Sequence, residues 1–271
     1  MRKISTMGIE TAVFERGTGP DILFLHGNPD THVVWDPVID RLSDVHHCIA
    51  PDLPGYGETH IDASYDCAIE KQGAWVDSLV SELGLSRVHL AIHDVGGAYG
   101  CSFVAQHPEK IASLTIFNTG FTPDQPWHFW ARVWRTPVLG EIAMKVATRG
   151  LFVSETLKGG PKMKREWAED AWKRYTPETR RNVLRWYRYM SFEKVLPGWD
   201  VRLRDAMKDI PRQILWGERD PYIPSFVRDR FEVPDVHNFA DCGHWVMMEA
   251  PEESAKLIAD LVARGSGPGT H

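Results

Sequence analysis

Short apolar runs alternate with amphipathic stretches through the first half of the chain. Four such runs, each bounded by polar or turn-forming residues, lie at 22–25, 47–50, 88–92 and 111–117. Between the second and third runs, apolar residues recur at the three- and four-residue spacing of one helix face, at Trp75, Val76, Leu79, Val80 and Leu83. Alternating strands and helices predict a parallel sheet covered by helices on both sides, with an antiparallel lead-in pair at residues 4–16.

The pattern changes between residues 121 and 200. No strand signal occurs there, helical patterns replace it, and the segment holds 15 Lys and Arg against 9 Asp and Glu. Strand patterns return at 213–216 and 236–239 and are followed by a helix from about residue 251 to 262. We therefore expect a core domain formed by residues 1–120 and 201–264, an inserted all-helical cap at 121–200 and a flexible tail at 265–271.

Composition and charge narrow the class of protein. The chain has 271 residues, of which 43% are hydrophobic and 25% charged, as in ordinary soluble proteins. A net charge of −6 disfavours binding to nucleic acid, which normally needs a basic surface. No stretch reaches the roughly 20 apolar residues of a membrane span, and the amino terminus lacks an apolar signal region. We expect a cytoplasmic protein without membrane partners, either a monomer or a homodimer.

The four cysteines are far apart in the sequence, and none belongs to a C-x-x-C motif. They are Cys48, Cys67, Cys101 and Cys242. This spacing predicts free thiols in a reducing compartment rather than a metal site or a disulfide framework. We therefore predict neither a metal nor a cofactor.

The most informative segment is residues 92–97, which read I-H-D-V-G-G. An apolar strand runs into a tight turn and then into a helix of small residues, which is the context of a nucleophile elbow. The usual elbow reads G-x-S-x-G, whereas here Asp94 is central, Gly96 is present and Ile92 replaces the first glycine. The alternative interpretation is that Asp94 only caps the helix.

Two downstream motifs favour a catalytic role for this aspartate. W-G-E-R-D-P places Asp220 just after a strand, and C-G-H-W places His244 before the last helix. Each alone is more often a turn former or a structural residue. The order nucleophile, acid, histidine, at the carboxyl ends of strands, is that of α/β-hydrolases. Upstream, H-G-N-P predicts an oxyanion hole formed by the N–H groups of Asn28 and Val95, although a plain turn would explain it too.

Together, the motifs H-G-N-P, D-L-P-G-Y-G, H-D-V-G-G, W-G-E-R-D and G-H-W resemble those of α/β-hydrolases with a helical cap. The resemblance is to the branch of epoxide hydrolases and haloalkane dehalogenases, extends from about residue 19 to 263, and is weaker in the cap. It implies a mostly parallel sheet flanked by helices and a nucleophilic aspartate, here Asp94. A carboxylate can displace a leaving group at saturated carbon, and water activated by His244 with Asp220 then hydrolyses the ester.

The leaving group separates the two activities of this branch. An epoxide oxygen leaves as an alkoxide and needs a proton donor, which a tyrosine can supply. Dehalogenases similar to this chain carry a tryptophan right after the nucleophile, where Val95 offers no side-chain donor. Asn28, in contrast, matches the second halide-binding residue of many dehalogenases. The stretch L-R-W-Y-R-Y-M resembles the corresponding segment of epoxide hydrolases and implies that Tyr187 donates to the epoxide oxygen.

Other cap residues are further candidates for substrate contacts. Tyr187 could instead belong to an aromatic helix face that packs on the core, with Tyr189 or Tyr175 as the donor. Most epoxide hydrolases have a second cap tyrosine; the corresponding region here has none, and His128 is the candidate in its place. We expect the substrate-binding residues to include His128, Trp127, Tyr189 and His26.

The leading prediction is a cofactor-independent epoxide hydrolase. It would convert a small apolar epoxide and water to a vicinal diol through an ester on Asp94. The alternative is a haloalkane or haloacid dehalogenase that uses the same nucleophile. A third hypothesis is a non-catalytic, ligand-binding member of the fold, because a fold alone does not determine function.

Overall fold

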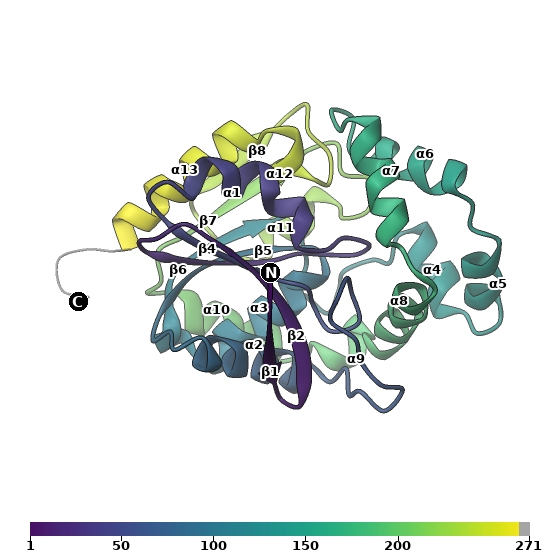
Figure 1. The fold of residues 1–271 in the computed structure, drawn as a ribbon, viewed down its shortest axis with the longest axis horizontal. Helices are drawn as coiled ribbons and strands as arrows, with labels where there is room; N and C mark the ends of the chain where they lie inside the picture. Colours follow the sequence, from purple (N-terminus) through teal and green to yellow (C-terminus); the bar gives the residue numbers. More distant parts are fainter. Residues whose placement is uncertain (266–271) are drawn as a thin grey trace.

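A single eight-stranded sheet forms the centre of the molecule (Figure 1). The computed structural model describes residues 1–265, so most of the predicted tail lies outside the described residues. The strand order is β1-β2-β4-β3-β5-β6-β7-β8; β2 is antiparallel to β1 and β4, and the other neighbours are parallel. The strands are β1 (Arg2–Thr6), β2 (Ile9–Arg16), β3 (Asp21–Leu25), β4 (His47–Pro51), β5 (Val88–His93), β6 (Ile111–Phe117), β7 (Arg212–Gly217) and β8 (Val236–Phe239).

Helices cover both faces of the sheet, because successive side chains of a strand point to opposite sides. In β3, Leu23 and Leu25 belong to one buried cluster and Ile22 and Phe24 to the other. The first cluster includes helices α2 (Ile69–Glu82), α3 (Val95–Gln106) and α10 (Trp199–Met207). The second includes α1 (Asp36–Leu42), α12 (Val246–Glu249) and α13 (Pro251–Gly265), together with the short helix η1 (His32–Trp35).

Large aromatic side chains fill both layers between the helices and the sheet. On the α2 and α3 side, Trp75 meets Tyr99 edge to face, with ring centroids 5.7 Å apart. On the other side, the buried Trp35 lies 5.2 Å from Phe24 and 5.3 Å from Phe117. The α/β-hydrolase fold predicted from the sequence is confirmed, and the largely apolar strands β5 and β6 are buried along their whole length, as expected for a parallel sheet covered on both faces.

The segment between β6 and β7 is helical. It contains α4 (Phe129–Arg135), α5 (Leu139–Val146), α6 (Arg149–Gly159), α7 (Arg165–Arg174), α8 (Pro177–Tyr189), α9 (Phe192–Val195) and α10. Helices α4 to α8 lie together at the right of Figure 1, whereas α10 packs against α3 of the core. Side chains of His128, Thr148 and Thr176 cap the amino ends of α4, α6 and α8 by accepting backbone hydrogen bonds. The two remaining short helices are η2 (Pro108–Lys110) and α11 (Ser225–Asp229).

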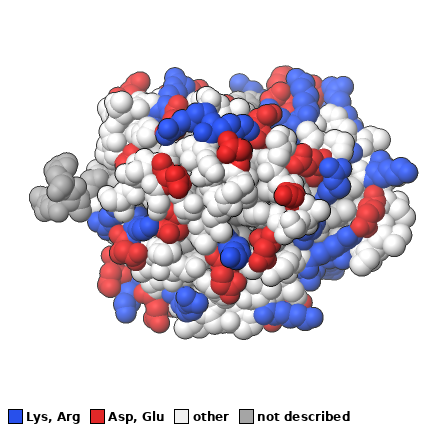
Figure 2. Space-filling view, turned by 60° about the horizontal axis from the view of Figure 1, so that its bottom comes forward, with Lys and Arg blue, Asp and Glu red and all other residues white. Residues whose placement is uncertain are grey.

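The surface charges and the cysteines do not point to a further functional site in the described residues. Basic and acidic side chains are interspersed over the face shown in Figure 2, and neither sign covers all of it. The four cysteines are buried free thiols, as predicted. Within residues 1–265, no helix combines the length and apolarity needed to cross a bilayer, and no group of three potential metal ligands occurs.

The amino end of α3 approaches β3 unusually closely. A Cβ atom on Gly96 would lie 2.4 Å from the carbonyl oxygen of His26, and one on Gly97 would lie 1.9 Å from Oγ1 of Thr119. Both distances are far below van der Waals contact. Glycine at these two positions therefore allows the turn between β5 and α3 to sit against the end of the sheet.

We expect Gly96→Ala to lower the free energy of unfolding by about 1–3 kcal/mol, since the methyl group overpacks this junction. Gly150→Ala is the matched control, because a Cβ atom there meets nothing within 4 Å and alanine favours the helix. The control should gain up to about 1 kcal/mol. Urea unfolding followed by circular dichroism measures both, and equal stability of Gly96→Ala and wild type would contradict the packing argument.

Candidate active site

Asp94 occupies the sharp turn between β5 and α3. Its backbone adopts φ 48° and ψ −120°, a conformation that a residue with a side chain seldom takes. Its carbonyl oxygen accepts hydrogen bonds from the Thr119 hydroxyl at 2.7 Å and from the Gly97 N–H at 2.9 Å. These bonds hold the strained turn, which presents the carboxylate at the carboxyl end of the sheet.

The structure brings Asp220 and His244 to this carboxylate. Asp220 follows β7 and His244 follows β8, so both lie at the same edge of the sheet as Asp94. His244 Nδ1 is 2.7 Å from Asp220 Oδ2, and His244 Nε2 is 3.6 Å from Asp94 Oδ2. The three residues that the motifs single out therefore form one buried acid–histidine–acid arrangement.

Charge within this arrangement favours an imidazolium between two carboxylates. Burial disfavours the charged form of His244, but the charge and hydrogen bond of Asp220, with those of Asp94, raise its pKa to about 10. Burial likewise opposes ionisation of Asp94, but His244 outweighs it and lowers the pKa of Asp94 to about 2. Asp94 is thus ionised at neutral pH, as a nucleophile requires.

Asp220 is fixed through both of its oxygens. Oδ2 accepts a hydrogen bond from the Asn118 side-chain amide at 2.8 Å in addition to the one from the histidine. Oδ1 accepts from the backbone N–H groups of Tyr222 at 2.7 Å and Ile223 at 3.2 Å. Asn118 also accepts from the Gly217 N–H at 2.9 Å, so it ties the end of β6 to the end of β7.

His93 supports the loop that carries His244. Its ring is fully buried, and its Nε2 lies 3.0 Å from the carbonyl oxygen of His244. Burial lowers the pKa of His93 to about 3, so the ring is neutral. A neutral ring that donates from Nε2 to this carbonyl positions His244 without competing for its charge.

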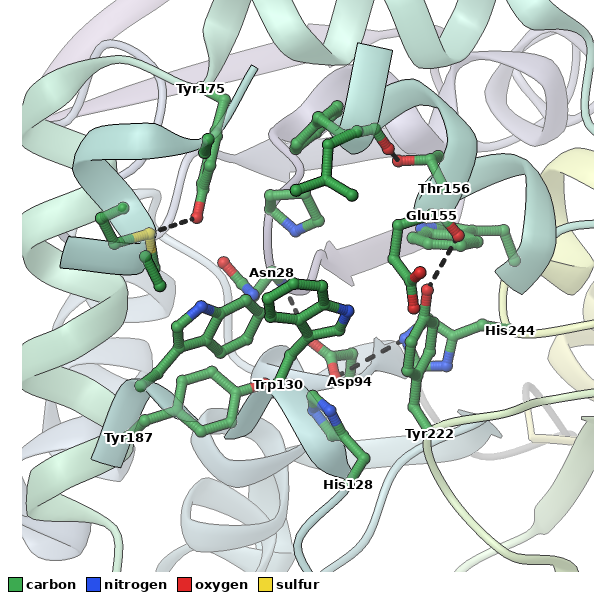
Figure 3. A pocket seen from close by; sticks show the side chains of 18 residues that line it. Asn28, Asp94, His128, Trp130, Glu155, Thr156, Tyr175, Tyr187, Tyr222 and His244 are labelled. Carbon is green, nitrogen blue, oxygen red and sulfur yellow. Dashed lines mark hydrogen bonds and ion pairs between the residues drawn. The ribbon is translucent and has the colours of Figure 1, made fainter. Parts of the chain in front are cut away.

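A cavity opens above Asp94, between the sheet edge and the helices inserted after β6 (Figure 3). Together with its opening to solvent, it encloses about 810 Å³ of empty space. Most of its wall is apolar or aromatic. Its aromatic lining residues other than histidine are Trp130, Trp134, Phe152, Tyr175, Tyr187, Tyr222 and Trp245.

The turn after β3 contributes a backbone donor to the floor of the cavity. The Asn28 N–H donates to Asp94 Oδ1 at 2.6 Å. A Cβ atom on Gly27 would lie 2.3 Å from the Cβ of Asp94, so this approach needs glycine. Val95 directly follows Asp94 as the first residue of α3. Of the two expected oxyanion-hole residues, Asn28 thus contacts the carboxylate through its N–H, and Val95 is the chain neighbour of Asp94.

Tyr187 of α8 lines the cavity, and its side chain is buried. Burial and the negative charge of Asp94 raise its pKa well above that of an ordinary tyrosine, opposed by a hydrogen bond from the Asn28 side chain. The hydroxyl consequently keeps its proton at neutral pH. It is a neutral donor facing the carboxylate.

His128 supplies a second neutral donor group at the cavity wall. Its Nδ1 accepts a hydrogen bond from the Ala131 N–H at 3.3 Å, which caps α4. Burial lowers the pKa of His128 to about 4, so the ring is neutral at pH 7. Since Nδ1 is the acceptor, we assign the ring proton to Nε2. Figure 3 shows the ring directed toward Asp94.

Two residues of the helical segment after β6 that were expected to bind substrate do not line the cavity. Trp127 stacks on Phe192, with ring centroids 3.9 Å apart, under the guanidinium of Arg135. Tyr189 is 44% exposed, because a position two residues beyond Tyr187 faces nearly the opposite side of α8. Trp127 thus packs behind the cavity wall, and Tyr189 faces solvent.

His26 is also outside the cavity. The ring is fully buried, with Nε2 accepting from the Leu53 N–H at 2.9 Å and Nδ1 2.9 Å from the Gly27 carbonyl oxygen. Nε2 therefore joins two loops, and Nδ1 contacts its own loop. Tyr175 does line the cavity, but its hydroxyl lies 3.0 Å from the sulfur of Met144.

Two residues that contact the His244 ring were not predicted from the sequence. Tyr222 and Trp245 meet the His244 ring edge to face, with centroids 5.2 and 4.9 Å away. The Trp245 indole N–H donates to Asp30 at 2.7 Å. The sequence signals were present, because Tyr222 directly follows W-G-E-R-D-P, Trp245 ends the motif G-H-W and Asp30 follows H-G-N-P.

Comparison with known proteins identifies the family. A family model described as "Alpha/beta hydrolase family" matches residues 22–257. The chain therefore belongs to the α/β-hydrolase family. The fold agrees: a solved structure of a meta-cleavage product hydrolase from Pseudomonas fluorescens superimposes with a TM-score of 0.83 at 17% identity, covering 97% of this chain and 98% of the other.

Individual relatives match this chain over different fractions of its length. A cis-3-alkyl-4-alkyloxetan-2-one decarboxylase from Shewanella oneidensis is 27% identical over 92% of this chain and 84% of its own. Epoxide hydrolase 3 from Siraitia grosvenorii is 37% identical, but over 45% of this chain and 40% of its own. Haloalkane dehalogenases are also among the relatives.

The Asp30 carboxyl group provides a pH-dependent test of the site's packing. Burial raises its pKa from 3.8 to about 6. In the unfolded chain it ionises near 3.8, so the unfolded state loses this proton first and folding becomes less favourable as pH rises from about 4 through 6. Asp30→Asn should therefore stabilise the protein more at pH 7.5 than at pH 4.5, by about 2 kcal/mol. Urea unfolding at both pH values measures this, and a pH-independent difference would contradict it.

Proposed function

We propose that this protein is an epoxide hydrolase that converts a small, largely apolar epoxide to a vicinal diol. The observation that carries the proposal is the pair of neutral donors, Tyr187 and His128, on the cavity wall facing the carboxylate of Asp94. In an epoxide bound between these groups, the carboxylate would face a ring carbon and the two donors would face the departing ring oxygen.

In the first half-reaction, an Asp94 oxygen attacks a ring carbon and the carbon–oxygen bond of the epoxide breaks. The leaving oxygen accepts hydrogen bonds from Tyr187 and His128 and takes the hydroxyl proton of Tyr187, which is replaced from solvent. The high pKa of Tyr187 keeps it protonated in the resting protein. The product of this step is an ester between Asp94 and the opened substrate.

Ester formation also prepares His244 for the second half-reaction. The charges of Asp220 and Asp94 together hold its pKa high. Esterification removes the charge of Asp94, so the pKa of His244 falls and it can release a proton. The neutral ring then activates water, while Asp220 stabilises the imidazolium that re-forms.

The N–H groups of Asn28 and Val95 would stabilise the oxyanion that forms when water attacks the ester carbonyl. The Asn28 N–H already lies 2.6 Å from one Asp94 oxygen. Collapse of this intermediate releases the diol and regenerates Asp94 with one oxygen from water. In this scheme residues 121–200 act as a cap that excludes bulk water from the cavity.

A second candidate reaction is opening of a four-membered oxetan-2-one ring. It is favoured by the decarboxylase relatives, which match 84% and 93% of their own lengths, against 40% for epoxide hydrolase 3. Both substrates are strained oxygen rings that a carboxylate could open beside neutral donors. A haloalkane fits less well, because Val95 stands where the related dehalogenases have a tryptophan donor.

A substrate panel separates these functions. Epoxides, haloalkanes and oxetan-2-ones of equal carbon number are incubated side by side, and diol, halide and carbon dioxide are quantified. We expect diol as the main product. Carbon dioxide or halide without diol would reject the epoxide assignment, and no turnover of any substrate would favour a ligand-binding protein.

Tyr187→Phe should lower kcat for an epoxide about 100-fold, because the leaving oxygen loses its proton donor but keeps His128. Tyr189→Phe is the matched control, since that residue is on the same helix but exposed to solvent. The control should retain kcat within about twofold. Steady-state diol formation measures both, and full activity of Tyr187→Phe would refute the donor assignment.

The covalent step predicts the origin of the oxygen in the product. With enzyme in excess, one turnover in ¹⁸O-labelled water should yield diol without label, because the incoming oxygen is that of Asp94. Repeated turnover should then give labelled diol, since each cycle places solvent oxygen in the carboxylate. Mass spectrometry of the diol decides; label in the first turnover would mean that water attacks the epoxide directly.

A further inference from the structure

Glu155 of α6 adds a charge to an otherwise largely apolar cavity. Among the described residues that line the cavity, the acidic side chains are Asp94 and Glu155. Figure 3 shows the Glu155 carboxylate pointing into the cavity, on the side of Tyr222 and His244. The side chain is 26% exposed, so it lies near the opening rather than at the floor.

The hydroxyl groups beside Glu155 already donate elsewhere. The Tyr222 hydroxyl donates to the backbone carbonyl of Glu155 at 3.1 Å. The Thr156 hydroxyl donates to the Phe152 carbonyl at 2.9 Å. The Glu155 carboxylate instead forms a long ion pair with Lys158, whose Nζ is 3.8 Å away. The Lys158 side chain is 67% exposed to solvent. The carboxylate therefore keeps acceptor capacity toward the cavity.

We propose that Glu155 forms a polar subsite for a positively charged or strongly hydrogen-bond-donating end group of the substrate, and that it discriminates against carboxylates. A carboxylate beside an apolar wall interacts with another charge more strongly than it would in bulk water. The aromatic faces of Phe152 and Trp245 on the same lining add favourable contacts with a cation. The proposed substrate class is thus an epoxide with an ammonium or hydroxyl tail rather than an epoxy acid. That the reacting group is an epoxide rests on the proposed function.

Ligand binding tests the subsite without requiring turnover. Dissociation constants of hexylammonium, 1-hexanol and hexanoate are measured by tryptophan fluorescence in the wild type and in three variants. Glu155→Gln removes the proposed charge, and Lys158→Gln removes its partner on the same helix. Glu166→Gln removes an exposed acidic charge outside the cavity and is the matched control.

We expect the ratio of the hexanoate to the hexylammonium dissociation constant to fall about fivefold in Glu155→Gln. The same ratio should rise in Lys158→Gln, because the carboxylate is then less neutralised, and should stay unchanged in Glu166→Gln. The affinity for hexanol should change less than the affinities for the two charged ligands. An unchanged ratio in Glu155→Gln, or an equal fall in Glu166→Gln, would overturn the proposal.

Epoxide turnover separates this inference from the proposed function. If a neutral epoxide is hydrolysed by wild type and Glu155→Gln while the ligand ratio does not move, the subsite fails and the epoxide hydrolase assignment stands. If the ratio moves as expected but no epoxide is hydrolysed, the subsite stands and the assignment fails.

Discussion

The site depends on how closely the turn between β5 and α3 packs against the loop after β3. Asp94 has a positive φ in this turn, and its side chain lies over Gly27 at a distance that excludes a methyl group. The same packing brings the backbone N–H of Asn28 to a carboxylate 66 residues later in the chain. The strained backbone and this close packing thus fix the position of the carboxylate relative to its hydrogen-bond donors.

The second organising feature is the distribution of charge. Asp220 accepts hydrogen bonds from His244, Asn118 and two backbone N–H groups, and these four bonds fix its position beside the imidazole. The neighbouring His93 and His128 both have lowered pKa values because they are buried. Positive charge among these three histidines is therefore concentrated on His244, where the proposed reaction uses it.

Much of this could be predicted from local sequence. The apolar strands and the motifs around Asp94, Asp220 and His244 each occupy a few consecutive residues, and parallel strands bring their carboxyl ends to one edge. The side chains of α8 that line the cavity were harder to predict, because tertiary packing decides which face of this helix meets the cavity. Tyr187 and Tyr189 are the same residue type two positions apart, yet Tyr187 is buried and Tyr189 is 44% exposed.

Other residues lacked a usable signal for a different reason. Glu155 is an ordinary acidic residue on a short helix, and its place on the cavity wall follows from how α6 lies over the core. Asp30 follows a recognised motif, but its partner Trp245 is 215 residues away in sequence. Contacts of this kind between distant segments carry no periodicity that a single sequence would reveal.

The capping role of His128 has a consequence for the hydrogen-bonding character of the cavity wall. Its ring is a donor toward the cavity because the first turn of α4 supplies a backbone N–H to Nδ1. If that turn unwinds, Nδ1 loses this partner and the ring proton is free to move to it. The chemical identity of the cavity wall is thereby coupled to the local folding of a seven-residue helix. A backbone hydrogen bond, rather than a neighbouring side chain, therefore determines that the ring presents a donor to the cavity.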